Sequence, residues 1–89
     1  MEGTTKSGFR FKVNEKVLED WRFTMALTKM EKRKTPFDAL QGMNEMAELL
    51  FGDDMERFFE HIKAQNDGIV PFKVVTEELK EILEQFPKN

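Results

Sequence analysis

The side chains that could perform acid–base chemistry are few in this sequence, and they centre on one histidine. His61 is the only histidine, and Glu60, Asp53 and Asp54 are the acidic residues near it in the chain. A general base or a metal site needs partners held at bonding distance, and closeness in the sequence does not supply that geometry. His61 also lies beside apolar helix positions, so we favour a surface or boundary role over catalysis.

Other signatures of catalysis and metal binding are missing from the sequence. There is no cysteine to act as a nucleophile or thiolate ligand, and the five glycines are too scattered to form a phosphate-binding loop. Asp53, Asp54 and Glu56 lack the ligand spacing of a calcium loop, and helix capping explains the two aspartates. We therefore expect no enzyme activity, no metal and no cofactor.

A basic run, KMEKRK, is the candidate for nucleic-acid contact. Its cations are Lys29, Lys32, Arg33 and Lys34. Aromatic residues shortly before this run could stack on bases. The alternative is that basic side chains near a helix C-terminus interact favourably with the helix dipole. We favour this alternative, because the chain has a net charge of −3 and no recognisable DNA-reading module.

Apolar side chains suggest a second kind of site, because six methionines and nine phenylalanines are many for a short chain. Methionine is flexible and recurs on adaptable binding surfaces. We predict that a partner-binding surface includes Phe9, Phe11, Phe23, Met25, Met30, Met43, Met46 and Met55. An equally good interpretation is that the methionines fill the core of the protein itself.

Hydrophobic periodicity predicts the helices that would position these residues. We expect a mainly α fold, a small bundle of about four helices at roughly 15–31, 36–51, 53–65 and 72–86. Asn14 and Thr35 are good N-caps, Pro36 suits a first helical position, and Gly52 suits a helix end.

The first of these helices carries two apolar stripes. One stripe contains Val17, Leu18, Trp21 and Met25, and the other contains Phe23, Leu27 and Met30. We interpret the helix as central, with both stripes covered and Trp21 buried. The alternative is that the stripe containing Phe23 contacts a partner.

A short strand is predicted before the helices. Residues 9–13 alternate apolar and basic side chains, which is the pattern of a half-buried strand. The segment 69–70 is β-branched and precedes a proline, so we expect it to be extended and to pair with 9–13. The strand could instead pair between copies, which makes a homo-oligomer an alternative.

The chain of 89 residues is short enough for a single domain. We expect a flexible segment at 1–7, a helical domain at 8–87 and a C-terminal end at 88–89. No apolar run approaches the ~18 residues that a membrane span requires, and the first residues lack the apolar centre of a signal peptide. We therefore expect no membrane association and a cytoplasmic location.

The order of these segments resembles that in the small tail assembly chaperones of long-tailed bacteriophages and prophages of Gram-positive bacteria. The resemblance extends from about Gly8 to Phe86. It lies in "GFRFKV", "LEDWRFTMAL", "AELLFGDD" and "NDGIVPFKVVTEELKEIL", taken in this order and spacing. Each of these is a structural pattern, and no single one is diagnostic of the family.

The resemblance implies a non-enzymatic protein of phage tail morphogenesis. Such a chaperone binds the tape measure protein, keeps it soluble and helps recruit tail-tube subunits. It acts in the host cytoplasm and is absent from the mature virion. Many members are also made in a longer form by ribosomal frameshifting. The alternative function is a small helical DNA-associated or regulatory adaptor that uses the basic segment 29–34.

Overall fold

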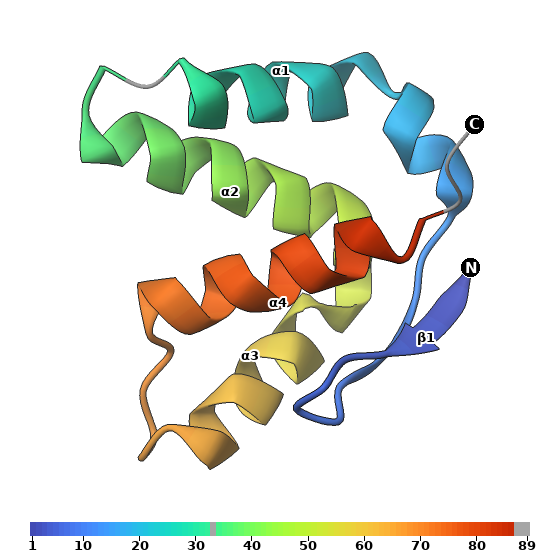
Figure 1. Cartoon of the computed structure of the whole chain (residues 1–89), viewed down its shortest axis with the longest axis vertical. Coiled ribbons are helices and arrows are strands. Elements are labelled where there is room, and N and C mark those ends of the chain that lie inside the picture. The colour runs from blue at the N-terminus through green and yellow to red at the C-terminus, as the bar shows by residue number, and fades with distance from the viewer. Residues whose placement is uncertain (33, 87–89) are drawn as a thin grey trace.

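The computed structural model describes residues 1–32 and 34–86, so Arg33 and residues 87–89 lie outside the described part. The protein is mainly helical with a short N-terminal sheet, as predicted (Figure 1). The helices are α1 (Trp21–Glu31), α2 (Pro36–Phe51), α3 (Met55–Gln65) and α4 (Phe72–Glu84). The strands are β1 (Glu2–Thr4) and β2 (Arg10–Lys12), and short 3-10 helices occupy Glu15–Glu19 and Gly52–Asp54.

The predicted continuous helix at 15–31 is wrong, because the chain breaks at Asp20. Residues Glu15–Glu19 form a 3-10 helix, and α1 begins only at Trp21. The backbone of Asp20 is extended, with φ −73° and ψ 127°, and its carboxylate accepts the N–H of Arg22 at 2.8 Å. A short acidic side chain competes well with the helix for such backbone donors, which makes Asp20 an N-cap rather than an interior residue.

Only one of the two apolar stripes of α1 faces the core, and it is the one containing Phe23. Phe23 is 2% exposed, and Met30 packs against the core. Trp21 is 72% exposed, so the prediction that it is buried is wrong. The reason is geometric: α1 packs on α2, and Trp21 lies beside this contact, next to a hollow that Glu45, Glu48 and Leu49 of α2 also line.

The α1–α2 contact is close because small residues lie where the helices meet. Gly42 on α2 and Ala26 on α1 are both buried. A Cβ atom added at Gly42 would lie 2.6 Å from the backbone oxygen of Ala26, well inside van der Waals contact. Gly42 therefore permits the close approach of the two helices.

The N-terminal ribbon consists of β1, β2 and the turn between them. The strands are antiparallel with Gly3 opposite Phe11, so the predicted pairing of residues 9–13 with 69–70 is wrong. The segment 1–7, expected to be flexible, supplies β1 instead. A tight turn explains this choice: Gly8 has φ 96°, and its N–H donates to the oxygen of Thr5 at 2.9 Å. A nearby segment closes a shorter loop than a distant one, at lower entropic cost.

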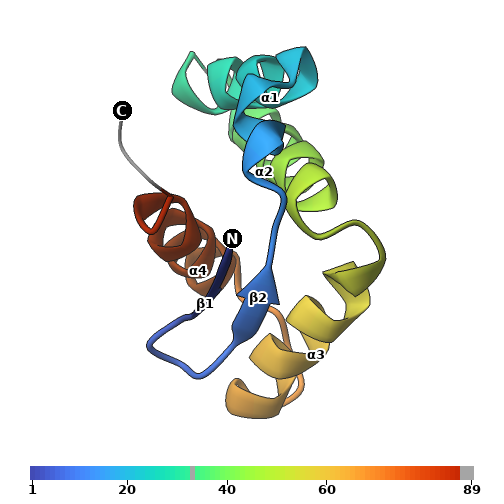
Figure 2. The same ribbon diagram turned by 90° about the vertical axis from the view of Figure 1, so that its right-hand side faces the viewer.

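The core forms where this ribbon meets the helices. Figure 2 shows the ribbon between α3 and α4, with the α1–α2 pair beyond one end of it. The ring of Phe9 lies 5.8 Å from that of Phe51 and 5.2 Å from that of Phe58, in edge-to-face geometry. From α4, Leu79 and Ile82 are each at most 2% exposed. The ribbon thus holds the end of α2 together with α3 and α4.

Candidate functional site

Most of the residues predicted to bind a partner lie in the core. Five of them are at most 5% exposed: Phe9, Phe11, Phe23, Met43 and Met46. Met30 and Met55 are partly buried against the core, and Met25 is 41% exposed. The structure therefore favours the alternative interpretation, in which most of these side chains fill the protein's own interior.

The basic run is dispersed rather than gathered into a stacking surface. Both carboxylate oxygens of Glu45 accept from Lys29 Nζ, at 2.7 and 3.0 Å. Lys32 and Lys34 are exposed and have no ion pair with another described residue, while Arg33 lies outside the described part. Lys32 follows the opposite end of α1 from Trp21, about 16 Å away along the helix axis. Lys29 lines the same hollow as Trp21, but Lys32 and Lys34 do not line it. The described part of the basic run is therefore not gathered around the indole.

A polar cluster that we did not predict from the sequence joins the ribbon to α3 and α4. The hydroxyl of Ser7 donates to Glu78 Oε1 at 2.5 Å and lies 2.9 Å from His61 Nε2. Glu78 is 6% exposed, and its Oε2 has no hydrogen-bond partner among the described residues. A signal was present in the sequence, since Glu78 is three residues after Val75 and four before Ile82, both on the buried stripe of α4.

The cluster contains a serine, a histidine and a carboxylate, but not in a catalytic order. In a nucleophilic triad, the acid binds the second nitrogen of histidine, and histidine takes the serine proton. Here the carboxylate of Glu78 binds the serine hydroxyl directly. The nearby N–H groups of Lys6 and Gly8 are also occupied, by Glu81 Oε1 at 2.6 Å and by a backbone oxygen at 2.9 Å. These contacts are those of a structural connection, and we assign it that role.

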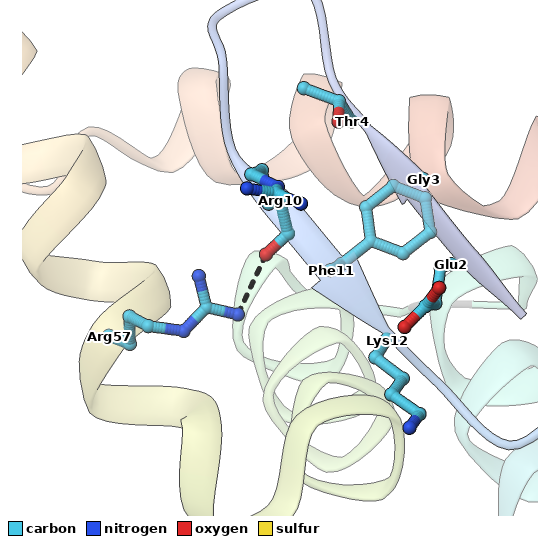
Figure 3. Close-up of a pocket in the computed structure, with 7 residues that line it drawn as sticks. All are labelled: Glu2, Gly3, Thr4, Arg10, Phe11, Lys12 and Arg57. Carbon is cyan, nitrogen blue, oxygen red and sulfur yellow. Dashed lines mark hydrogen bonds between the residues drawn. The ribbon is translucent and has the colours of Figure 1, made fainter.

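Arg57 makes a second connection, at the outer edge of the ribbon. Figure 3 shows its guanidinium reaching the backbone oxygen of Arg10, at 2.7 Å, beside a hollow of about 510 Å³ on the outward face of β1 and β2. The same guanidinium lies 4.6 Å from the centre of the Phe9 ring, in cation–π geometry. Arg57 thus satisfies a carbonyl at the strand edge and covers a core aromatic.

A groove lined largely by apolar side chains lies between α2 and α4, and we call it the apolar groove. It measures about 570 Å³ and is lined by Met30, Pro36, Ala39, Leu40, Met43, Phe72 and Thr76. Figure 1 shows the α1–α2 turn and the start of α4 on the same side of the molecule. Leu40 and Phe72 are 42% and 51% exposed, and nearby in sequence Phe37 and Ile69 are 77% and 62% exposed. The sequence alone does not reveal this groove, because Phe37 and Leu40 share the helical spacing of the buried residues Met43, Ala47 and Leu50.

A second apolar surface, the Trp21 patch, lies around the start of α1. It contains Trp21 and Met25, which are 72% and 41% exposed, together with the half-buried Leu49. A hollow of about 540 Å³ lies beside Trp21, and Glu48 is among the charged residues that line it. The Trp21 patch and the apolar groove therefore lie toward opposite ends of the α1–α2 pair (Figure 1).

Neither a metal centre nor a membrane span is found in the described part of the chain. Residues 1–32 and 34–86 contain no group of three or more His, Asp or Glu side chains that could hold a metal ion. No helix in these ranges combines the length and the apolar character that crossing a membrane requires. Comparisons of the chain with protein-family models, with curated proteins and with solved structures gave no match.

Proposed function

We propose that this protein is a non-enzymatic chaperone that binds an apolar helical segment of a partner protein in the apolar groove. The observation that carries the proposal is that two large exposed apolar side chains line this groove, Leu40 at 42% and Phe72 at 51% exposure. Such groups on soluble proteins commonly mark sites of protein interaction, because water is released when a partner covers them.

The shape and composition of the groove suit a helix as the partner segment. The groove runs between two helices, and an amphipathic helix binds such a surface through apolar side chains spaced three or four residues apart. Met30 and Met43 line it. Methionine side chains adapt to different shapes, so the groove can accept related segments that differ in sequence.

The resemblance to tail assembly chaperones supplies the identity of the partner in this proposal. The partner is the tape measure protein of the same phage or prophage, and the complex helps recruit tail-tube subunits during tail morphogenesis. The protein acts in the host cytoplasm and leaves before the virion is complete. A tape measure protein is long and rich in apolar helices, which matches the chemistry of the groove.

Co-expression with the tape measure protein tests this function. We expect the long protein to stay soluble and to copurify only when the chaperone is present. If neither this chain nor a frameshifted longer product retains the tape measure protein, the chaperone function is rejected.

A matched pair of variants tests the position of the site. Leu40 in the groove and Leu18 outside it are 42% and 40% exposed, so serine substitutions remove similar exposed apolar surface from each. Combining Leu40→Ser with Phe72→Ser should remove roughly 2 kcal/mol of apolar burial and weaken retention about 30-fold. Leu18→Ser should have little effect. Equal effects of the groove and control substitutions would reject the groove as the binding site.

A further inference from the structure

We propose that a polar hollow between the ribbon, α3 and α4 binds the guanidinium group of an arginine side chain of a partner protein. We call it the acidic hollow, and Ser7 of the ribbon, His61 of α3 and Glu78 of α4 are among the residues that line it. It measures about 350 Å³. It is separate from the apolar groove, because Glu81 in the hollow follows Phe72 in the groove by nine residues, about half a turn around α4.

The acidic hollow carries an excess of negative charge. Its charged side chains are the carboxylates of Glu77, Glu78 and Glu81 and the ammonium group of Lys6. None of these four forms an ion pair with another described residue. Glu77 and Glu81 are four residues apart on one helix, a spacing at which like charges destabilise each other. A cation bound between them would relieve this repulsion.

Glu78 supplies a second and independent indication of a ligand. Its side chain is 6% exposed, and the hydroxyl of Ser7, which lines the same hollow, holds its Oε1 at 2.5 Å. Its Oε2 has no hydrogen-bond partner among the described residues. A buried carboxylate oxygen without a donor is unfavourable. A cation in the hollow would compensate the charge of Glu78 at short range and give its carboxylate a donor.

The arrangement of the carboxylates favours a guanidinium group over a metal ion. A metal ion needs oxygen ligands that converge on one point, and residues 1–32 and 34–86 contain no such group of three or more His, Asp or Glu side chains. A guanidinium is planar and directs five N–H donors to several sides, so it binds carboxylates that lie apart. An ammonium group is more strongly hydrated and concentrates its charge at one point.

The rest of the lining suits the apolar stem of arginine. Ile62 is buried and Val74 is half-buried, and both line the acidic hollow beside the carboxylates. Long cationic side chains cover apolar surface with their methylene groups while the charged end reaches polar partners. The backbone N–H of Lys6 also holds Glu81 Oε1 at 2.6 Å, so part of the acceptor set is fixed before binding.

Titration of the isotope-labelled protein with N-acetylarginine amide, followed by NMR at constant ionic strength, tests the proposal. We expect saturable shifts of the amides of Lys6 and Ser7 and of the His61 ring, with Kd on the order of 1 mM for one charged group. N-acetyllysine amide should bind at least about 3-fold more weakly. Equal binding of the two probes, or shifts that do not saturate, would overturn the proposal.

Methylguanidinium distinguishes an arginine side chain from a small free guanidinium compound. It carries the charged group without the propyl stem, so it should bind about 3-fold more weakly than N-acetylarginine amide. Binding of equal strength would overturn the assignment to an arginine side chain.

Substitutions along α4 locate the site. Glu81→Gln and Glu78→Gln each remove one charge, the latter keeping an oxygen acceptor for Ser7, and each should weaken binding about 10-fold. The control, Glu84→Gln, makes the same change at an exposed position of α4 that does not line the hollow, and it should leave Kd within about 2-fold. Lys6→Gln removes a competing cation and should strengthen binding about 2-fold. Equal losses in Glu81→Gln and Glu84→Gln would show only general attraction of cations and would overturn the site.

Far-ultraviolet circular dichroism of each variant separates loss of binding from loss of folding. Glu81 is only half-buried, so Glu81→Gln keeps the test decisive even if Glu78→Gln does not fold. None of these measurements contains the tape measure protein or alters the apolar groove, so their failure is distinguishable from failure of the chaperone function.

Discussion

Replacing Gly42 by alanine is expected to destabilise the protein, although alanine is the better helix former. In an open helix this substitution would stabilise by about 1 kcal/mol. Here the added Cβ would lie 2.6 Å from the backbone oxygen of Ala26 and 3.0 Å from Met30 Cγ. The side chain of Met30 can move, but the carbonyl of Ala26 belongs to α1, so the helices themselves must separate.

The expected change in the free energy of unfolding combines two opposing contributions, overpacking at the α1–α2 contact and the better helix propensity of alanine. Overpacking of a tight contact costs about 1–3 kcal/mol, and the gain in helix propensity offsets about 1 kcal/mol of that cost. A net loss of roughly 1 kcal/mol would lower Tm by about 4–8 °C in a domain of this size.

Urea and thermal unfolding of Gly42→Ala measure this loss, with Gln41→Ala as the control. Gln41 is the preceding residue of α2 and is exposed, so its substitution changes helix propensity without adding a contact to α1. We expect Gln41→Ala to be neutral or slightly stabilising. If Gly42→Ala instead raises the free energy of unfolding by about 1 kcal/mol, the close approach of α1 and α2 is refuted.

Three other predictions concern the exposure of Trp21, the hydrogen bond between Ser7 and Glu78, and the pKa of Asp20. Trp21→Ala should change the free energy of unfolding of the monomer by less than about 0.5 kcal/mol in urea titrations, and a loss of about 3–5 kcal/mol would mean that Trp21 is buried. Ser7→Ala removes the donor to buried Glu78 and should cost about 1–3 kcal/mol, whereas Ser7→Thr should retain most of the stability because it keeps a hydroxyl. The hydrogen bond from Arg22 lowers the pKa of Asp20 from 3.8 to about 2, and NMR titration should show this midpoint in the wild type and a return toward 3.8 in Arg22→Ala. Because the folded pKa is the lower one, the stabilisation is present above about pH 4 and is lost as the pH falls through 2.

The helices were predictable because periodicity is a local property of the sequence. On α4, Val75, Leu79 and Ile82 recur at helical spacing, and all three are buried. On α1, two stripes are equally apolar, and the sequence does not show which one α2 covers. Trp21 was therefore misplaced, because helical spacing alone does not distinguish the covered stripe from the exposed one.

The apolar groove, the Trp21 patch and the polar cluster could not be predicted from the sequence, because each depends on tertiary structure. Ser7 is 54 residues from His61 and 71 residues from Glu78, and no local pattern connects them. The pairing of β2 was missed for a related reason, because the segment before it lacks apolar alternation. The sequence signals of a hairpin were the two threonines at 4–5 and the glycine at position 8, which adopts φ 96° in the structure.

The packing of the N-terminal ribbon has a consequence for synthesis on the ribosome. Phe9 and the strand that follows it are made early, but Phe58, whose ring packs on Phe9, and Ile82 of the same core cluster are made much later. At about 5–20 residues per second, the ribosome needs roughly 4–15 s to reach Ile82 after Phe9. Through that interval the nascent chain holds an uncovered apolar strand, and the speed of translation sets how long the strand is open to misassociation.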